Sequence, residues 1–431
     1  MNSLHKPTPE EIRQTRRDFP PQLIRETPLE ELPRLSALHG NPVYVKDEGK
    51  QNIRSYKGRG STAIMQALSE EERSRGVVCA SAGNHAQGVA AACHHFRVRG
   101  TVFMPTITPE QKIEATKRHG GDFVAIALHG DTFDEASQKA HAYAEEKRAV
   151  FLPPFDNWDV IRGQGTVAVE IAEQMAALRK EIGAVLVPVG GGGLMAGTIL
   201  ALKDSHPHTQ IIGVEPAEAA SMTESLKAGK PVTIERMDKF VDGAAVARPG
   251  DRPFAVISHA VEEGRARMMT VSKGLLCATM VDLYQIEGII TEPAGALSIA
   301  AVTQLDHGTQ GTKVCILSGT NFDIRRNKSV TDLADCFRHT KIYVGIHLPN
   351  RPGALREMLD ALAPALAGVN IEFMHFDTAT SNGDPPLCIG IASRSGNPID
   401  IDQFLQSLSE QRLSDGSQHY PFHVLEEKPE T

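Results

Sequence analysis

The sequence predicts an α/β protein with doubly wound parallel sheets, followed at its C-terminal end by a ferredoxin-like α+β domain. The chain has 431 residues, 41% of them hydrophobic, which suffices for two or three packed domains. Short apolar runs alternate with helix-like segments over most of the chain, and this alternation is typical of parallel sheets. The last stretch instead shows the order β-α-β-β-α-β, which is typical of ferredoxin-like folds.

A unit of strand, loop and helix recurs through the first part of the chain. An apolar run from Val77 to Ala80 precedes a Ser-Ala-Gly-Asn turn and a helix, and similar units begin near Val98, Gly121 and Thr209. In the second of these units, a proline at position 109 marks the start of the helix. Because ligands of such folds bind at the carboxyl ends of the strands, we expect the functional residues there.

One uncharged segment, residues 183–202, is long enough to cross a bilayer. It reads GAVLVPVGGGGLMAGTILAL, and four successive glycines in a helix would each cost about 1 kcal/mol relative to alanine. Pro188 just before the glycines is also unfavourable inside a helix. We therefore predict a strand, a glycine loop and a helix here, and not a membrane span.

Charge and cysteine content narrow the class of function. Lysine and arginine total 45 against 53 for aspartate and glutamate, so no nucleic-acid or membrane partner is expected. The six cysteines are scattered without a C-x-x-C pair, which is typical of a reducing compartment, and the N-terminal residues lack the apolar stretch of a secretory signal. We expect a cytoplasmic protein that acts on a small molecule and holds no metal.

The polar stretch TDLADCFRHTK predicts a domain boundary near residue 335. The catalytic domain would cover residues 1–334, with a smaller α/β subdomain around 60–155, and the second domain would cover residues 335–431. In the second domain, apolar residues alternate over 342–348, and four others repeat at helical spacing: Leu355, Met358, Leu359 and Leu362. The runs VNIEFMHFD, PLCIGIASR and YPFHVLEE predict further strands, and IDQFLQSLSEQ predicts a helix. No nucleophile, base and anion loop come together here, so we interpret this domain as regulatory.

Two motifs in the first half of the chain carry candidate chemistry. Lys57 lies between Ser55-Tyr56 and Gly58-Arg59-Gly60, and a lone lysine is usually a solvated surface residue. The run Ser81-Ala82-Gly83-Asn84-His85 follows an apolar strand, where backbone N–H groups at a helix N-terminus could receive a carboxylate. An ordinary N-cap with a glycine turn explains that run equally well, so neither motif is decisive alone.

Two further motifs follow apolar strands. The loop Gly190-Gly191-Gly192-Gly193 permits close approach of backbone to a phosphate. It matches neither the ATP-binding pattern G-x-x-x-x-G-K-[ST] nor a dinucleotide fold, which needs an acidic residue about 20 positions later. The run Ser318-Gly319-Thr320-Asn321 ends the strand VCIL, and a hydroxyl in that place is as often a helix cap as a ligand.

In combination, these motifs resemble those of threonine dehydratases of pyridoxal-phosphate (PLP) fold type II. The four motifs and Glu292-Pro293-Ala294-Gly295-Ala296 occur in that family's order, and the resemblance extends from roughly Thr27 to Asn327. It implies a tryptophan synthase β-like fold. The run Asn350-Arg351-Pro352-Gly353-Ala354-Leu355 resembles that of an ACT-like regulatory domain, and one such copy resembles the short biosynthetic form.

The resemblance also implies roles for the matched residues. Lys57 would carry PLP covalently and later move protons, and Asn84 would bind the 3′ oxygen of the cofactor. The phosphate would be held by Gly190, Gly191, Gly192 and Gly193, and Ser318 would face the pyridine nitrogen. The substrate carboxylate would lie near Ser81, Gly83 and His85. The implied reaction removes water and then ammonia from L-threonine to give 2-oxobutanoate, the first step of isoleucine biosynthesis, in a homo-oligomer (dimer or tetramer) inhibited by isoleucine.

Several alternatives stay open at this point. The segment Lys46-Asp47-Glu48-Gly49-Lys50-Gln51 departs from the family's Lys-Arg-Glu-Asp-Leu-Gln, which puts local packing and substrate preference in doubt. L-serine is a second candidate substrate, and a serine dehydratase, a serine racemase or a catalytically silent amino-acid sensor are rival functions. Related racemases resemble Ser-Ser-Gly-Asn-His where this chain has Ala82, whose methyl group cannot donate a proton. By resemblance, a cation could bind near Glu215, although a glutamate at a strand end is more often only a hydrogen-bond acceptor.

Overall fold

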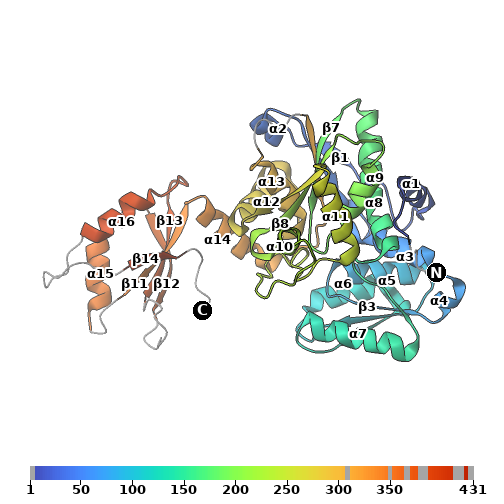
Figure 1. Cartoon of the computed structure of the whole chain (residues 1–431). Helices are drawn as coiled ribbons and strands as arrows, with labels where there is room; N and C mark the ends of the chain where they lie inside the picture. Colours follow the sequence, from blue (N-terminus) through green and yellow to red (C-terminus); the bar gives the residue numbers. More distant parts are fainter. Residues whose placement is uncertain are drawn as a thin grey trace. The chain divides into compact units, whose positions relative to one another are not determined.

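The computed structural model describes residues 5–305, 311–347, 352–363, 369–376, 387–410 and 422–425. It divides the chain into two compact units, shown in Figure 1. The first unit comprises Met1–Leu276 and Leu283–Asp323, and the second comprises Cys277–Asp282 and Ile324–Thr431. The boundary that we predict at residue 335 lies inside helix α14 (Asn327–Phe337), which belongs entirely to the second unit. The domain limits in the sequence analysis therefore stay a prediction.

The first unit contains a six-stranded sheet of order β1-β2-β10-β7-β8-β9. All neighbouring strands pair in parallel except the edge strand β1, which is antiparallel to β2. Almost every residue of the central strands is buried, as expected of a sheet covered on both faces. The strands are β1 (Leu29–Glu31), β2 (Val43–Asp47), β7 (Ile182–Pro188), β8 (Gln210–Pro216), β9 (Ala266–Val271) and β10 (Thr312–Leu317).

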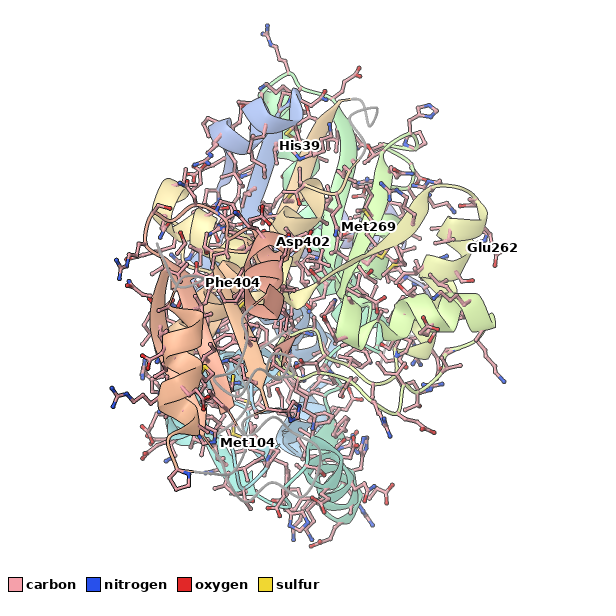
Figure 2. All side chains as sticks on the ribbon, turned by 90° about the vertical axis from the view of Figure 1, so that its left-hand side faces the viewer. His39, Met104, Glu262, Met269, Asp402 and Phe404 are labelled. Atoms are coloured by element: carbon pink, nitrogen blue, oxygen red, sulfur yellow. The ribbon has the colours of Figure 1, made fainter. Side chains whose placement is uncertain are left out.

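A second, four-stranded parallel sheet of order β5-β4-β3-β6 forms a smaller layer in the same unit. The strand predicted from Val77 to Ala80 is β3 with those bounds, and its neighbours are β4 (Gly100–Met104), β5 (Val124–Leu128) and β6 (Val150–Phe151). Met104 at the end of β4 is fully buried, whereas Glu262 on a helix of the larger layer is exposed at the periphery (Figure 2). Two parallel sheets with interleaved helices confirm the predicted α/β class.

The helices of the first unit begin at residues suited to that position. Thr8, Ser69 and Thr132 each form a capping box with a glutamate three residues later. The helices are α1 (Pro9–Asp18), α2 (Pro33–His39), α3 (Lys57–Ala67), α4 (Glu70–Ser74), α5 (Asn84–Phe96), α6 (Glu110–Gly120), α7 (Phe133–Lys147), α8 (Trp158–Ala177), α9 (Gly193–Leu202), α10 (Ser221–Ala228), α11 (Asp251–Glu262) and α13 (Pro293–Val302), with 3-10 turns η1 (Glu48–Lys50), η2 (Gly121–Phe123) and η3 (Ala217–Ala219). Helix α12 (Lys273–Glu287) is shared, because its residues Cys277–Asp282 belong to the second unit.

The uncharged segment 183–202 folds as predicted into β7 without its first residue, the glycine loop and α9. Gly192, at the N-cap of α9, has φ = +89°, a conformation that a residue with a side chain rarely adopts. Among the residues that the structure describes, no helix is both long and apolar enough to cross a membrane.

The second unit holds a four-stranded sheet of order β12-β13-β11-β14 with antiparallel pairing throughout. Its elements follow the predicted order β-α-β-β-α-β after a turn η4 (Ile324–Arg326) and α14. They are β11 (Lys341–Ile346), α15 (Ala354–Leu362), β12 (Val369–Phe376), β13 (Leu387–Ser393), α16 (Ile401–Glu410) and β14 (Phe422–Leu425). Met358 and Phe404, the latter labelled in Figure 2, pack on the sheet. The ferredoxin-like prediction is confirmed, while Leu348, Asn350, Arg351 and the turn TATSNGDP lie outside the described residues.

Candidate active site

The candidate site residues follow the carboxyl ends of neighbouring strands. Ser318 follows β10, the glycine loop follows β7, and these two strands pair in parallel. Strand β10 also pairs with β2, with Leu317 opposite Asp47, and the chain leads from β2 to Lys57. In the smaller sheet, Asn84 follows β3. Four motifs that are far apart in the sequence therefore lie at the strand ends where parallel sheets bind ligands.

Lys57 is the first residue of α3, and its half-buried amine donates a hydrogen bond to the carbonyl oxygen of Pro154 at 3.2 Å. The two residues before Lys57 form hydrogen bonds with Ser318. The hydroxyl of Ser55 and the backbone N–H of Tyr56 both donate to the carbonyl oxygen of Ser318, each at 3.1 Å. The structure thus brings the lysine motif and the serine motif together.

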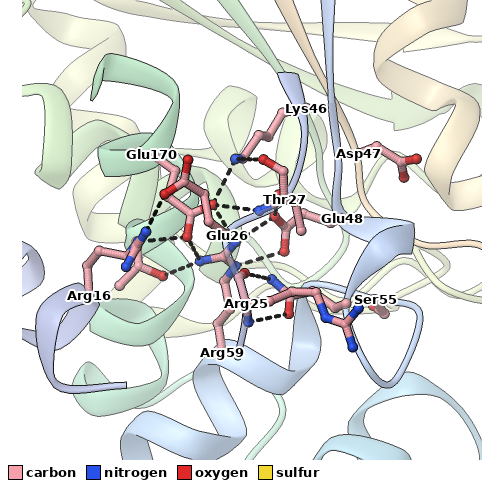
Figure 3. A network of polar contacts seen from close by, with 12 residues as sticks. Arg16, Arg25, Glu26, Thr27, Lys46, Asp47, Glu48, Ser55, Arg59 and Glu170 are labelled. Atoms are coloured by element: carbon pink, nitrogen blue, oxygen red, sulfur yellow. Dashed lines mark hydrogen bonds and ion pairs between the residues drawn. The ribbon is translucent and has the colours of Figure 1, made fainter. Parts of the chain in front are cut away.

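A buried network of charges holds the helix that carries Lys57 (Figure 3). The guanidinium of Arg59 pairs with Glu48 and with Glu170 of α8, each at 2.8 Å, and all three side chains are fully buried. Lys46 of β2 pairs with Glu170 at 2.7 Å. Burial alone would lower the pKa of Arg59, but the two carboxylates raise it above its ordinary value, so the guanidinium stays charged. The network ties α3 to β2 and α8.

Two residues of the segment 46–51, which departs from the family pattern before Lys57, belong to this network. Lys46, Glu48 and Gln51, which agree with the family pattern, are almost completely buried. Gly49 departs from that pattern and lies against Thr320, because an added Cβ would stand 2.2 Å from the Thr320 methyl group. The departure changes packing beside the Ser318 motif and leaves the network intact.

The glycine loop is packed against the segment that follows β6. An added Cβ at Gly191 would stand 2.3 Å from the ring of Phe155, and one at Gly193 would stand 3.1 Å from the Phe155 Cβ. The loop therefore has no room for side chains on this face. Its backbone N–H groups at Gly190, Gly191, Gly192 and Gly193 have no hydrogen-bond acceptor among the described residues.

The start of α5 carries the Ser81–His85 motif. Ser81 accepts a hydrogen bond from the Gly83 N–H at 3.2 Å, so it turns back on its own loop. No described residue accepts a hydrogen bond from the backbone N–H groups of Asn84, His85 and Ala86, as is usual in the first turn of a helix. These N–H groups are free to receive an anion.

His85 is a buried, neutral residue. Its Nε2 lies 2.9 Å from the carbonyl oxygen of Leu152 and must donate to it. Burial, together with the charge of Lys57, lowers the pKa of His85 to about 4 against the opposing effect of that hydrogen bond. The imidazole is therefore uncharged near neutral pH and cannot attract a carboxylate as a cation.

Ser318 lies beside a pair of asparagines and a buried glutamate. The hydroxyl of Ser318 has no hydrogen-bond partner among the described residues. Asn84 donates to Glu292 at 2.7 Å, and Asn321 donates to the Oδ1 of Asn84 at 2.7 Å. An added Cβ at Gly319 would stand 2.4 Å from the Glu292 carboxylate. The smaller layer and the larger layer therefore meet through side-chain amides at this point.

Comparison with known proteins identifies the family. A model described as "Pyridoxal-phosphate dependent enzyme" matches residues 21–319. The chain belongs to this family. Its two parallel sheets are those of PLP fold type II, and the second unit is consistent with an ACT-like domain.

Individual members of the family are similar over most of the chain. A biosynthetic L-threonine dehydratase of Corynebacterium glutamicum is 41% identical over 406 residues, which are 93% of this chain and 92% of that protein. The processed form of threonine deaminase isoform 2 from Solanum lycopersicum has a TM-score of 0.69 and 39% identity, covering 77% of this chain and 96% of that one. Maize serine racemase has a similar TM-score, 0.68, at 28% identity, covering 76% and 97%. The resemblance to threonine dehydratases is thereby confirmed.

The residues of this PLP-dependent enzyme fit its cofactor. PLP needs a lysine amine, a cradle for a dianionic phosphate and polar groups around its ring. The chain offers the half-buried amine of Lys57, the uncommitted N–H groups of the glycine loop at the positive end of α9, and the uncommitted hydroxyl of Ser318. Within the described residues, no group of three or more His, Cys, Asp or Glu could hold a metal ion.

Glu215, where the resemblance leaves a cation site open, has other partners. Its carboxylate accepts hydrogen bonds from the backbone N–H groups of Met222 and Thr223, at 2.7 and 2.9 Å, and from the Thr223 hydroxyl at 2.6 Å. These contacts favour the alternative in which Glu215 is a hydrogen-bond acceptor at the start of α10.

The segment that follows β6 belongs to the site, although it was not predicted from the sequence. Pro154 holds the Lys57 amine, Leu152 holds His85, and Phe155 packs on the glycine loop. This short segment thus contacts three of the four motifs. Its signal in the sequence is the pair Pro153-Pro154, which is unfavourable inside a helix and indicates a loop. Strand β6 has only two residues, which is too short to show a period.

Proposed function

We propose that this chain is a threonine dehydratase, which converts L-threonine to 2-oxobutanoate and ammonia by elimination of water. The observation that carries the proposal is the 41% identity to a biosynthetic L-threonine dehydratase over 93% of the chain. The four motifs, gathered at the carboxyl ends of the strands, support it independently, because they supply an amine, an anion cradle and a carboxylate-binding helix start.

Each group has a part in the proposed reaction. When bound, PLP withdraws electrons from the amino acid and so acidifies its Cα–H. The amine of Lys57 holds the cofactor and later moves the proton from Cα. The N–H groups of Gly190, Gly191, Gly192 and Gly193 would hold the phosphate, and the Ser318 hydroxyl would face the ring nitrogen. A neutral hydroxyl there leaves the ring without a fixed positive charge, which suits elimination better than transamination.

The substrate carboxylate binds at the start of α5 in this proposal. Ser81 and Gly83 shape the loop, and the free backbone N–H groups of Asn84 and His85 receive the carboxylate. His85 contributes through its backbone, because its neutral ring is committed to Leu152. Asn84 contributes its side chain to the 3′ oxygen of the cofactor.

Threonine is the proposed main substrate and L-serine a second one. Racemisation is a weaker candidate, although a serine racemase has a similar fold. It requires an acid on the opposite face of Cα, and the half-buried Ala82 carries only a methyl group in the substrate loop.

The second unit is proposed to bind isoleucine and to inhibit the enzyme, and the enzyme to act as a homo-oligomer, a dimer or a tetramer. The proposed compartment is the cytoplasm. The six free cysteines, five of them buried, support a reducing environment.

One assay tests the function. The purified, PLP-loaded chain is given L-threonine or L-serine, with and without isoleucine or valine, and the 2-oxoacid is measured. Formation of 2-oxobutanoate from L-threonine supports the proposal. Absence of any 2-oxoacid, with PLP bound, would refute it, and D-serine as the main product from L-serine would favour the racemase.

A further inference from the structure

The amide of Asn84 is held from both sides. Its Nδ2 donates to the Glu292 carboxylate, and its Oδ1 accepts from the Nδ2 of Asn321, both at 2.7 Å. The direction of these bonds is determined by Ile53, whose carbonyl oxygen accepts from the same Asn321 nitrogen at 2.9 Å. Because a carbonyl can only accept, the Asn321 nitrogen must lie on that side, and the Asn84 oxygen must face it. The Asn84 nitrogen therefore faces Glu292.

The Glu292 side chain forms its hydrogen bond with Asn84 and not with the helix that Glu292 precedes. It is the N-cap residue of α13, yet its side chain does not cap that helix. The carboxylate points to Asn84 and also accepts from the backbone N–H of Asn321. Gly319 leaves room for it, because a Cβ there would stand 2.4 Å from Oε1. A carboxylate that is only 7% exposed is thus directed at one amide.

No neighbouring positive charge among the described residues explains why the Glu292 carboxylate is buried beside Asn84. Burial and the charge of Asp242 raise the pKa of Glu292 to about 7, while Asn84, Lys112 and the Asn321 backbone oppose the shift. Lys112 is itself paired with Asp242 at 2.6 Å. Burying this carboxylate is therefore costly, and no described cation forms an ion pair with it within 4 Å. Its specific contacts are the amide of Asn84 and the backbone of Asn321.

We propose that Glu292 is a positioning residue that orients the Asn84 amide toward the cofactor. An amide nitrogen has two hydrogens, and Glu292 takes one of them. The second is left to donate to the ring oxygen of PLP, while Asn321 keeps the Asn84 oxygen away from that negatively charged atom. Without Glu292 the amide would be held by Asn321 alone, and its second N–H would be directed less firmly at that atom. This inference depends on the proposed function, because it assumes PLP beside Asn84.

A double-mutant cycle tests the proposal with cofactor binding as the readout. The four proteins are wild type, Glu292→Gln, Asn84→Ala and the double variant, and each is measured for PLP affinity and for the visible absorbance band of bound PLP. A neutral glutamine accepts a weaker hydrogen bond than a carboxylate, so it holds the Asn84 amide less firmly than Glu292 does. We expect Glu292→Gln to weaken PLP binding about tenfold and to shift the band. In the Asn84→Ala background, Glu292→Gln should have no further effect.

Two additional variants separate positioning from folding. Glu215→Gln is the matched control, because Glu215 is a buried carboxylate whose pKa is likewise raised to about 7 and which accepts its hydrogen bonds from α10. It should leave the absorbance band unchanged. Glu292→Asp keeps the charge but shortens the side chain, and it should resemble Glu292→Gln. Equal band shifts in Glu292→Gln and Glu215→Gln would overturn the proposal.

The outcomes distinguish this inference from the proposed function. Additive effects of Glu292→Gln and Asn84→Ala on PLP affinity, in a wild-type enzyme that binds PLP and forms 2-oxobutanoate, would refute the positioning role alone. A wild-type protein that binds no PLP would refute the proposed function and the positioning role with it.

Discussion

The ring of Phe155 lies so close to Gly191 that a Cβ on the glycine would stand 2.3 Å from a ring carbon. Such a contact cannot persist, and Phe155 is a half-buried side chain that follows two prolines. The glycine at 191 is therefore required by packing against protein, in addition to the approach of its backbone to a phosphate.

We predict that Gly191→Ala weakens PLP binding by displacing the loop from Phe155. An overpacked site typically costs about 1–3 kcal/mol, which corresponds to roughly a 5- to 150-fold loss of affinity. Equilibrium titration of the apoprotein with PLP measures this change. The double variant Gly191→Ala/Phe155→Ala should lose less than the two single variants added together, because removal of the ring relieves the clash. Additive losses would contradict this explanation.

The second prediction concerns Lys57. Its replacement by alanine removes the amine that the Pro154 carbonyl holds, and so removes both covalent attachment and proton transfer. Turnover of L-threonine should fall by at least roughly 10²- to 10⁴-fold, and the visible absorbance of bound PLP should disappear. Lys50→Ala is the matched control, because Lys50 ends the turn η1 shortly before α3 and its side chain is 66% exposed. Comparable losses in both variants would argue against the assignment of Lys57.

A third prediction follows from the buried charges around α3. Arg59→Met leaves Glu48 and Glu170 without the cation that each of them pairs with at 2.8 Å. Removing one partner of a buried pair costs about 3–5 kcal/mol, so the thermal midpoint of unfolding should drop markedly. Lys117→Met removes an exposed partner of Glu114 and should cost at most about 1 kcal/mol. A wild-type midpoint for Arg59→Met would show that the network contributes little.

The parts of the fold that could be predicted from sequence are those set by local patterns. The apolar run Val77–Ala80 is bounded by a turn, and it is β3 with the predicted ends. The stripe around Met358 predicts α15 in the same way, because the period of an amphipathic helix is written in neighbouring residues. Strand β6 has no such period, and its two residues are ordered by pairing with β3.

In the candidate site, too, only the features set by local patterns could be predicted from the sequence. Glycine runs and strand-end hydroxyls are visible in the sequence, so Gly190–Gly193 and Ser318 could be proposed from it. The contact between Asn84 and Glu292 joins residues 208 positions apart, and no local pattern specifies it. The role of Phe155 was equally hidden, because it depends on how the smaller sheet lies against the glycine loop.

The fourth prediction is an acid-sensitive contribution of Glu170 to stability. Burial raises the pKa of Glu170, but Arg59 and Lys46 outweigh it and lower the pKa from 4.5 to about 2. A carboxyl with a lowered pKa in the folded state stabilises the protein above its ordinary pKa, and this stabilisation is lost as the pH falls from about 5 toward 2. In Glu170→Gln, the thermal midpoint should be lower at pH 7 and should fall less steeply below pH 5. A control variant, Glu114→Gln, should follow the wild-type curve, and parallel curves for all three proteins would contradict the prediction.

The last prediction concerns isoleucine and the second unit. Gly353 is the N-cap residue of α15 with φ = +87°, and its turn opens a helix whose first N–H groups could receive the carboxylate of an amino acid. Valine at this position would strain the turn by about 1–2 kcal/mol and move those N–H groups. In the wild type, isoleucine should raise the threonine concentration needed for half-saturation by roughly 5- to 150-fold, because it binds the less active state more tightly. Gly353→Val should abolish most of that shift and keep the activity measured without isoleucine.

Gly396→Val is the matched control, since Gly396 has φ = +73°, lies in the same unit and likewise has no atom within 4 Å of an added Cβ. It imposes the same kind of strain away from the start of α15 and should leave the isoleucine response intact. Threonine saturation curves for the three proteins decide the matter: loss of the response in both variants would attribute it to general destabilisation of the unit, and a wild type that ignores isoleucine would refute the regulatory role while leaving the dehydratase proposal in place.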